Sequence, residues 1–329
     1  MIAPPGAFRV VEPADVDAAT AVHESEPGSR YLGGGTDLLV NLRRGLGTPS
    51  LLIDLRGIAE LDGLACEAGG ARIGAGVTLA RIAADPEFRA RYPALCEAAG
   101  AVAGPAHRNV ATVAGNLCLD TRCIYYNQSE WWRGANAYCL KYRGDVCHVA
   151  PQGKHCHAAF CGDLAPALLV LGTSIEVAGR EGRRRMPLAE LYREDGLAHL
   201  TLAAGELIVA VELPADPPPS AYAKLRVRGS VDFPLAGVAV ALRAEEGRLA
   251  ALRVALTGTN SRPFLLDGTG DLLGRPLGAD ALQQLDRLVQ KQVQPMRTTL
   301  LQSNYRRVAV AALTRRLAAR LATTQQIAR

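Results

Sequence analysis

Hydrophobic residues recur along the chain in short runs, separated by turns that contain glycine or proline. Runs of about four to eight apolar residues predict buried strands, whereas apolar residues three or four positions apart predict helices. Both patterns follow one another closely, so the sequence predicts an α+β fold. We expect strands at 50–57 and 205–214, a helix at 91–103, a strand entering a helix at 29–45 and 71–83, and a helix followed by a strand at 163–179.

The stretch 215–221, with three consecutive prolines at 217–219, is the best linker candidate, because proline lacks the N–H that a helix or a central strand needs. We therefore expect one domain over 1–215, built from a small α/β unit and a larger mixed-sheet unit. A second domain is expected over 216–329. Within it, 234–259 predicts two strands joined by a turn at Gly247, and helices follow.

Basic residues dominate the C-terminal segment 286–329, where nine Lys or Arg accompany a single acid, Asp286. Binding of single-stranded nucleic acid would require interleaved aromatic residues, and the segment holds only Tyr305. Apolar residues recur in it at helical spacing, which places the arginines largely on other helix faces. We therefore expect a solvated or partner-facing helix and no nucleic-acid ligand. The apolar positions are Val310, Leu313, Leu317 and Leu321.

The composition is that of an ordinary soluble protein, with 49% hydrophobic and 21% charged residues. No run approaches the roughly 20 apolar residues of a membrane span, and residues 1–22 show no signal-peptide pattern. We therefore expect a cytoplasmic protein that spans no membrane. Disulfides seldom persist in that compartment, where clustered cysteines more often bind metal or react.

Six of the eight cysteines lie within residues 118–161, together with both tryptophans. Four of them, Cys123, Cys139, Cys147 and Cys156, follow one another at intervals of 16, 8 and 9 residues. Structural zinc usually takes cysteines in closely spaced pairs. The wide spacing favours a larger iron–sulfur cluster, with zinc as the main alternative. Aromatic residues of the same segment would form a small core that shields the cluster. They are Tyr125, Tyr126, Trp131, Trp132, Tyr138 and Tyr142.

Two glycine-containing stretches form a second candidate site. Residues 33–36 read GGGT between a predicted strand and helix, where backbone N–H groups can approach an anion and Thr36 or Asp37 can cap the helix. A branched side chain at Gly34 would fill the space that the anion needs. The stretch 102–118 adds a proline turn and small polar residues suited to a flat ligand. Neither stretch has the glycine pattern of nucleotide triphosphatases or ordinary dinucleotide folds.

These two motifs, at this separation, resemble those of the FAD-binding subunits of molybdenum hydroxylases. That family includes carbon monoxide dehydrogenase and xanthine dehydrogenase. The resemblance covers essentially the whole chain, from FRVVEPADVDAA through GDLAPALLVLG to SNYRR near the end. It implies an FAD-binding domain of the molybdopterin dehydrogenase type, followed by a C-terminal domain of sheet plus helices. It also implies an electron-transfer chain without a catalytic residue of its own.

The resemblance assigns a role to each position that matches the family. The loop at 33–38 would wrap the FAD pyrophosphate, and the second stretch would line the other side of the flavin. Asp163 would contact the sugar-alcohol chain, while Ile208 and Lys224 would flank the isoalloxazine ring. The implied cofactor-binding residues are Leu32, Gly33, Gly34, Gly35, Thr36, Asp37, Leu38, Ala103, Thr112, Gly115, Asn116, Asp163, Ile208 and Lys224.

Standard members of the family run directly from the second glycine stretch to the next helix, whereas about forty residues, 119–160, intervene here. An insertion with cysteines at this point resembles the β subunits of 4-hydroxybenzoyl-CoA reductases, which carry a [4Fe–4S] cluster. That match implies Cys123, Cys139, Cys147 and Cys156 as the cluster ligands. Other cysteines and histidines nearby would be structural, lie around the cluster or lie at the surface. They are Cys118, Cys161, His148, His155 and His157.

The same resemblance implies two partner subunits, a large one with molybdopterin and a small one with [2Fe–2S] clusters, in a dimer of heterotrimers. The assembly would reduce 4-hydroxybenzoyl-CoA to benzoyl-CoA with ferredoxin as the electron donor. Two alternatives stay open. The chain could be a flavoprotein subunit that passes electrons to NAD or a quinone, or a zinc-stabilised binding module without redox activity.

Overall fold

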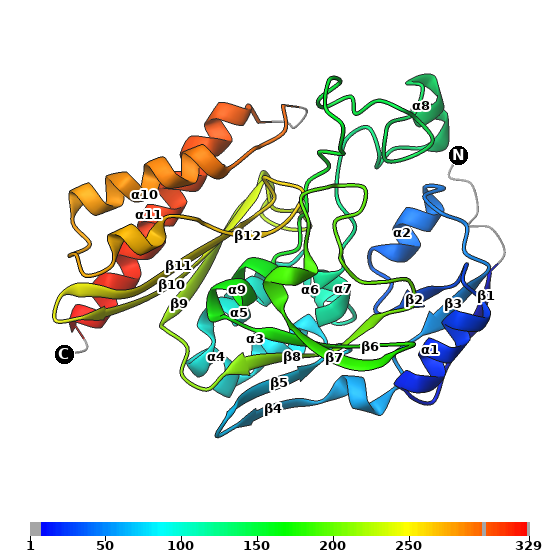
Figure 1. The fold of residues 1–329 in the computed structure, drawn as a ribbon, viewed down its shortest axis with the longest axis horizontal. Coiled ribbons are helices and arrows are strands. Elements are labelled where there is room, and N and C mark those ends of the chain that lie inside the picture. Colours follow the sequence, from blue (N-terminus) through cyan, green and yellow to red (C-terminus); the bar gives the residue numbers. More distant parts are fainter. Residues whose placement is uncertain (1–7, 298–300, 328–329) are drawn as a thin grey trace.

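The computed structural model describes residues 8–297 and 301–327, which form three sheets with helices packed against them (Figure 1). Two of the sheets are built from the N-terminal two-thirds of the chain, and the third is built from the C-terminal third. This is the α+β architecture that the sequence predicts. No helix within the two described ranges is long and apolar enough to cross a membrane.

The small N-terminal unit is a parallel sheet in the order β1 (Arg9–Val11), β3 (Leu51–Asp54) and β2 (Arg30–Leu32). It is accompanied by α1 (Val16–Ser25) and α2 (Leu38–Arg43). The central strand β3 is buried at every position, as is usual in parallel sheets that are covered on both faces. The glycine loop predicted from the sequence joins β2 to α2.

The larger sheet is antiparallel, in the order β4 (Leu64–Glu67), β5 (Gly70–Gly74), β8 (Leu207–Pro214), β6 (Ser174–Gly179) and β7 (Gly182–Pro187). Strand β8 lies at its centre and is buried over most of its length. The edge strand β7 is mostly exposed and carries three arginines. Charges on an edge strand discourage pairing with another sheet.

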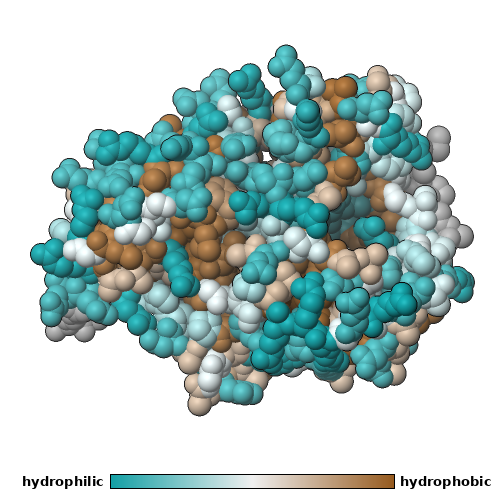
Figure 2. Space-filling view, viewed as in Figure 1, coloured by the Kyte–Doolittle hydropathy of each residue, from teal (hydrophilic) through white to brown (hydrophobic). Residues whose placement is uncertain are grey.

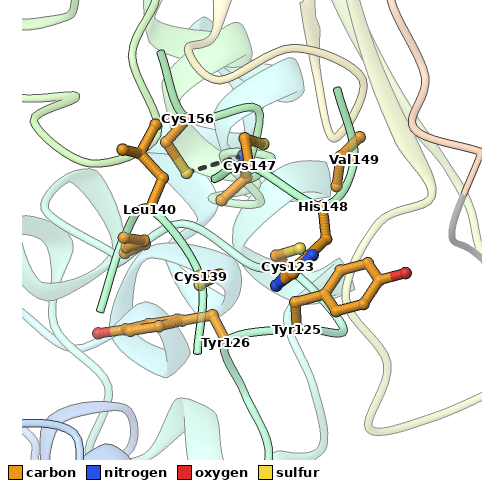
Figure 3. Close-up of a pocket in the computed structure, with 11 residues that line it drawn as sticks. Cys123, Tyr125, Tyr126, Cys139, Leu140, Cys147, His148, Val149 and Cys156 are labelled. Carbon is orange, nitrogen blue, oxygen red and sulfur yellow. Dashed lines mark hydrogen bonds between the residues drawn. The ribbon is translucent and has the colours of Figure 1, made fainter. Parts of the chain in front are cut away.

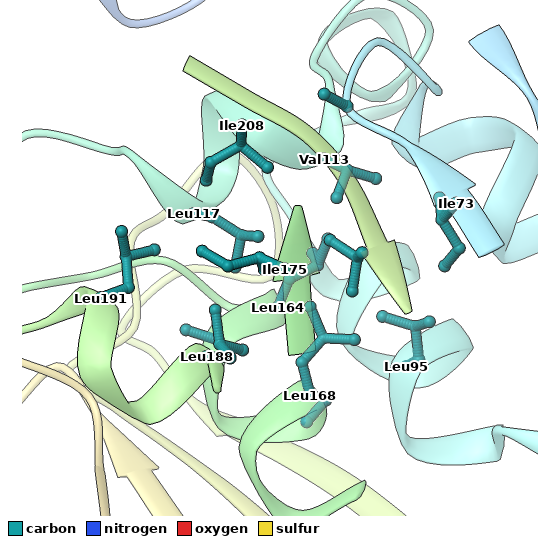
Figure 4. Packing of buried hydrophobic residues seen from close by; sticks show 14 of the residues in the cluster. Ile73, Leu95, Val113, Leu117, Leu164, Leu168, Ile175, Leu188, Leu191 and Ile208 are labelled. Atoms are coloured by element: carbon teal, nitrogen blue, oxygen red, sulfur yellow. The ribbon is translucent and has the colours of Figure 1, made fainter. Parts of the chain in front are cut away.

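Short helices and this sheet enclose the main hydrophobic core (Figure 4). The helices are α3 (Leu79–Ala84), α4 (Pro86–Arg91), α5 (Pro93–Ala101), α6 (Pro105–Arg108), α7 (Val113–Leu117) and α9 (Leu164–Leu171). Leu95, Leu117 and Leu168 from the helices meet Ile73 and Ile175 from the sheet. Helix α9 is buried at all of its positions and therefore lies at the centre of the core. Helix α5 begins at a proline, a favoured residue in a first helical turn, so it is shorter than the helix expected there.

The C-terminal region has a separate hydrophobic core between an antiparallel sheet and two helices. Its elements are β9 (Ser220–Leu225), β10 (Ala236–Glu245), β11 (Arg248–Thr257), β12 (Phe264–Leu265), α10 (Ala279–Gln292) and α11 (Ser303–Ile327). Strands β10 and β11 form the hairpin predicted around Gly247, whose φ of +75° suits glycine. The stretch expected to be a linker is shorter than predicted, because Ser220 already starts β9 and is buried.

Helix α11 buries Val310, Leu317 and Leu321, as the apolar spacing predicts. Arg306 on the same helix differs from the expectation of solvated arginines, since only 1% of its surface is exposed. Its guanidinium donates to the carbonyl oxygens of Leu235, at 3.2 Å, and Gly258, at 2.7 Å. A cation that is paired with backbone carbonyls in this way can be buried at an acceptable cost.

Between α7 and α9 the chain projects from the body of the molecule as a lobe with one short helix, α8 (Glu130–Ala135), at the top of Figure 1. We call residues 124–157 the insertion lobe. Its two ends meet at a neck, where Arg122 and Ala159 exchange both backbone hydrogen bonds, at 2.7 and 2.9 Å. The neck lies between the two glycine stretches and the lobe, so the lobe is anchored beside them.

Candidate functional site

The glycine loop after β2 packs directly against the segment that precedes α7. A Cβ atom at Gly34 would lie 1.7 Å from the carbonyl oxygen of Val110, and one at Gly33 would lie 2.8 Å from Oγ1 of Thr112. Such an approach is possible only without a side chain. Thr112 also caps α7 by accepting the N–H of Gly115 at 3.2 Å. The two predicted motifs, about seventy residues apart in sequence, therefore form one junction.

Asp37 occupies the position before α2, but its side chain makes none of the helix-capping hydrogen bonds that the sequence suggests. One carboxylate oxygen accepts Nδ2–H of Asn41 at 3.1 Å. The other pairs with the guanidinium of Arg122, which belongs to the neck of the insertion lobe. The glycine loop and the insertion are thus joined by opposite charges.

A cleft of about 880 Å³ opens where the glycine stretches, the small unit and β8 meet. Small-molecule sites span roughly 300–1,000 Å³, so the cleft can hold a ligand as large as FAD. Of the fourteen residues predicted to bind FAD, Leu32 and Lys224 are not among the described residues that line the cleft. The other twelve line it: Gly33, Gly34, Gly35, Thr36, Asp37, Leu38, Ala103, Thr112, Gly115, Asn116, Asp163 and Ile208.

Asp163 forms part of the cleft wall and is held from behind by two donors on β9. Lys224 Nζ lies 3.0 Å from one carboxylate oxygen, and the Tyr222 hydroxyl donates to the other at 2.6 Å. Lys224 also donates to the carbonyl oxygen of Ala101 at 3.1 Å. Burial raises the pKa of Asp163, while Lys224 and Tyr222 favour its charged form. Lys224 therefore orients Asp163 from outside the cleft wall.

The four cysteines selected from the sequence line a single second cavity (Figure 3). Cys139, Cys147 and Cys156 are buried, and Cys123 is half-buried. Burial raises the pKa of the Cys123 thiol to about 11 and that of Cys156 to about 12. Without a cation the thiols of Cys123 and Cys156 are therefore neutral at pH 7, and a bound metal centre would have to stabilise their thiolates.

The cysteine cavity does not have the geometry of a site for one metal ion. Structural zinc needs four ligands at about 2.0–2.3 Å from a common centre. Among the described residues, no three His, Cys, Asp or Glu side chains converge closely enough to hold an ion. The cavity has a volume of only about 10 Å³, room for a single water molecule, so its size does not distinguish zinc from a larger cluster, and either centre would require the cysteine-bearing loops to shift.

Cys118 and Cys161 lie elsewhere, as walls of the large cleft rather than of the cysteine cavity. Burial raises the pKa of both thiols, to about 12 for Cys118 and about 11 for Cys161. All eight cysteines of the chain are within the described ranges, and each is free of a disulfide. The two cysteines at the ends of the insertion are therefore separated from the four inside it.

Two of the six aromatic residues predicted to enclose the cysteines, Tyr125 and Tyr126, line the cysteine cavity. Tyr126 packs with Cys139 and Leu46, and Tyr125 packs beside the same small cluster. His148 also lines the cavity, and its ring lies 4.8 Å from that of Tyr125. Trp131 was expected in this core, but 79% of its surface is exposed. Its position on the outer face of α8 leaves it outside the cluster.

Sequence reasoning missed two basic residues of the site, Lys141 and Arg122, and it missed the contact of Tyr126 with the large cleft. Lys141 is almost fully buried beside the cysteine cavity, where it pairs with Asp120 at 2.6 Å and lies 4.4 Å from the ring centre of Tyr126. Tyr126 lines both the cysteine cavity and the large cleft. Arg122 reaches the glycine loop from the neck. Their only sequence signal is proximity to the cysteines.

Comparison with known proteins agrees with this geometry. Residues 6–216 match the family model of the FAD binding domain in molybdopterin dehydrogenase, and 220–321 match that of the CO dehydrogenase flavoprotein C-terminal domain. The chain is 36% identical over 269 residues to the FAD-binding subunit of an Escherichia coli aldehyde oxidoreductase, covering 78% of this chain and 82% of that protein. It is 26% identical to the carbon monoxide dehydrogenase medium chain of Afipia carboxidovorans, covering 85% and 84%.

Solved structures show the same fold. A chain of the reconstituted CO dehydrogenase from Oligotropha carboxidovorans superposes with a TM-score of 0.79 at 24% identity, covering 98% of this chain and 99% of that one. A chain of quinoline 2-oxidoreductase from Pseudomonas putida 86 gives a TM-score of 0.78 at 24% identity, with the same coverage. On the family match along most of its length, the cleft formed by two glycine stretches and the relative at 36% identity, this chain belongs to the FAD-binding subunits of the molybdenum hydroxylase family.

Proposed function

We propose that the chain is an electron-transfer subunit that holds FAD in the large cleft and a [4Fe–4S] cluster on Cys123, Cys139, Cys147 and Cys156. The observation that carries the cluster is the cysteine cavity itself, lined by these four cysteines and by none of the other four. Cysteine thiolates are the ligands of such clusters, one at each of four corners. When bound, FAD exchanges one or two electrons and so connects one-electron centres to two-electron chemistry.

The residues of the cleft have distinct parts in holding FAD under this proposal. The loop at 33–38 offers backbone N–H groups to the diphosphate, and 112–116 closes the opposite side. Asp163 accepts hydrogen bonds from the cofactor's sugar-alcohol chain, and Lys224 and Tyr222 keep its carboxylate in place. Tyr126 supports a short electron route, because it is a wall of both the cysteine cavity and the cleft.

The proposal includes two partner subunits, one large with molybdopterin and one small with [2Fe–2S] clusters, in a dimer of heterotrimers. Relatives are named as medium chains, which is the term for one of several subunits. The space-filling view adds a physical reason, since hydrophobic residues gather on the half of this face where the C-terminal strands and helices lie (Figure 2). Exposed apolar patches commonly mark protein–protein contacts.

Two overall reactions have support. Similarity to an aldehyde oxidoreductase subunit favours aldehyde oxidation, in which an aldehyde and water give a carboxylic acid, two protons and two electrons that leave through this chain to NAD, a quinone or another acceptor. The resemblance of the cysteine insertion favours the reverse flow. In that case two electrons from ferredoxin and two protons convert 4-hydroxybenzoyl-CoA to benzoyl-CoA and water.

Metal analysis of anaerobically purified protein tests the cluster. We expect about four irons and four sulfides per chain, and loss of most iron when any one of Cys123, Cys139, Cys147 or Cys156 is replaced by serine. Cys118→Ser and Cys161→Ser are the matched controls and should keep their iron, because both side chains lie outside the cysteine cavity. Stoichiometric zinc without iron would instead identify the zinc-stabilised module.

Substrate assays of the native assembly separate the two reactions. Aldehyde-dependent reduction of an artificial dye, without conversion of 4-hydroxybenzoyl-CoA by reduced ferredoxin, is the expected result for an aldehyde-oxidising enzyme. The opposite pair of results would assign the reductive reaction. If neither substrate is converted, both candidate reactions are wrong. The cofactor assignments are then tested separately, by metal analysis and flavin content.

A further inference from the structure

The neck of the insertion lobe places two consecutive side chains in two different cavities. Arg122 is hydrogen-bonded through its backbone to Ala159, as in a short antiparallel bridge. Successive side chains in extended chain point to opposite sides. Accordingly Arg122 lines the large cleft, whereas Cys123 lines the cysteine cavity. The insertion therefore contributes a cation to the flavin cleft at the point where it also contributes its first cysteine.

Arg122 is held in the cleft by contacts from three parts of the chain. Its guanidinium pairs with Asp37 of the glycine loop and donates to Oδ1 of Asn41 at 3.1 Å. It also lies 4.5 Å from the ring centre of Phe233, a residue of the C-terminal region. Only 12% of the side chain is exposed. Its Nε atom is buried and has no partner among the described residues.

The charges around the glycine loop explain why a cation belongs there. Asp37 places a carboxylate in the loop proposed to receive the FAD diphosphate, and two anions at close range repel each other. Arg122 offsets that carboxylate and, as a planar guanidinium with five N–H groups, can also serve an adjacent phosphate. Of the other arginines that line the cleft, Arg56 is already bound to Asp54 through both carboxylate oxygens, and Arg30 and Arg44 are exposed.

We propose that Arg122 binds the diphosphate of FAD, so that the neck of the insertion lobe completes the flavin site. The proposal rests on the proposed position of FAD in the cleft and is independent of which metal centre the cysteines hold. It adds to the glycine stretches a binding residue from a segment that standard members of the family are expected to lack. Flavin affinity and folding of the insertion lobe are then coupled through a single residue.

Calorimetric titration of the full chain, stripped of flavin, tests the contact directly. The probes are FAD and ADP, because ADP carries the diphosphate without the flavin ring. Arg122→Met should weaken both by at least about tenfold, the scale of a lost charge-assisted hydrogen bond. Arg122→Lys should lose less, since it keeps the charge. Arg143→Met is the control, because Arg143 is an exposed arginine of the same lobe that pairs with Glu130 outside the cleft.

The outcomes separate this inference from the flavin assignment. Equal FAD and ADP affinities in wild type and a folded Arg122→Met protein would overturn it, as would a loss for FAD without a loss for ADP. A wild-type chain that binds neither probe would contradict the flavin cleft itself. If the Arg122→Met protein does not fold, the affinity of Arg122→Gln for both probes and the salt dependence of ADP binding to the wild type are measured instead. Wild-type ADP affinity that does not fall with rising salt would also overturn the inference, because an ionic contact must be screened.

Discussion

Gly34 is the residue at which the two glycine stretches approach most closely. The position that a Cβ atom would take is already filled by the Val110 carbonyl group, at 1.7 Å from its oxygen. The sequence correctly marks Gly34 as intolerant of a side chain, but the reason differs from the expected one. A side chain would strike the protein backbone rather than the ligand's space, so the junction itself depends on this glycine.

Gly34→Ala should therefore separate the two stretches and abolish tight FAD binding. We expect a loss of stability of about 2 kcal/mol or more, because the obstacle is backbone and cannot rotate away. Thermal unfolding and flavin content of the purified chain measure both effects. Gly57→Ala is the control, since nothing lies within 4 Å of a Cβ atom there. Wild-type flavin content in the Gly34→Ala protein would remove the junction from the FAD site.

Single residues show where sequence reasoning succeeds and where it stops. Cys123 and Cys156 could be chosen for one site because type and spacing carry that information. The part played by Lys224 could not be read, since it depends on β9 packing behind Asp163, 61 residues away in sequence. Arg122 was missed for a similar reason, because its partner Asp37 becomes adjacent only when the neck closes.

At the scale of elements, a buried arginine helps to fasten the insertion lobe to the small unit, beside the Tyr142 hydroxyl, which donates to Gly45 at 3.0 Å. Arg133 on α8 has no exposed surface and donates to the carbonyl oxygens of Arg44, at 3.0 Å, and Gly45, at 3.3 Å, beyond the end of α2. It also pairs with Glu130 at 2.5 Å. These contacts satisfy carbonyl groups that a helix end leaves free.

Arg133→Met should loosen the lobe without unfolding the rest of the chain. Removing the guanidinium takes the side-chain donor from the carbonyl group of Arg44, at a cost of about 1–3 kcal/mol, whereas that of Gly45 keeps the Tyr142 hydroxyl. Hydrogen exchange should therefore quicken within 124–157 and stay unchanged in β8 and α9. Arg143→Met, which removes an exposed arginine of the lobe, should leave exchange as in wild type. Uniformly faster exchange in the main core would show that Arg133 supports the entire fold instead.

Elements with a strong local pattern were predicted well, including the β10–β11 hairpin and the buried helix α9. Their type follows from apolar spacing and from turn residues such as Gly247, which act over a few positions. Capping of α2 by Asp37 was not fulfilled, because a tertiary partner, Arg122, takes the carboxylate. Trp131 was expected in the aromatic core but is exposed, because the number of aromatic residues in a segment does not say which face of the helix each one occupies.

At the scale of the molecule, the two predicted sites share one wall. The large cleft lies between the small parallel sheet and the larger antiparallel sheet, and the insertion lobe closes over one side of it. The order of these parts along the chain could be read from the sequence. The contact between these parts could not be predicted from the sequence, since it depends on packing between loops about 75 residues apart, from 36 to 112. Under the proposed function, that contact brings the FAD cleft and the cysteine cavity together at Tyr126, which lines both.

Acid should destabilise the folded chain through His199, which is buried and donates Nε2–H to the carbonyl oxygen of Leu119 at 3.0 Å. Burial lowers its pKa from 6.5 to about 4. Below pH 6.5 the unfolded chain therefore binds a proton that the folded chain does not bind until about pH 4. Stability should fall as the pH drops through this window, by at most about 3 kcal/mol.

Urea unfolding at pH 7 and pH 5 measures this effect, with His199→Gln as the matched variant. Glutamine can still donate to Leu119 but does not titrate, so its stability should change less between the two pH values. An equal change in wild type and His199→Gln would mean that other groups, such as buried carboxylates, account for the acid sensitivity.

Both tryptophans of the chain lie next to each other on α8, one exposed to solvent and the other in contact with Tyr125. Indole is consequently excited only in the insertion lobe. The intrinsic emission of the natural protein thus monitors this lobe and no other part of the fold. Filling of the cysteine cavity, docking of a redox partner or local melting of α8 can each be followed optically without attaching a dye.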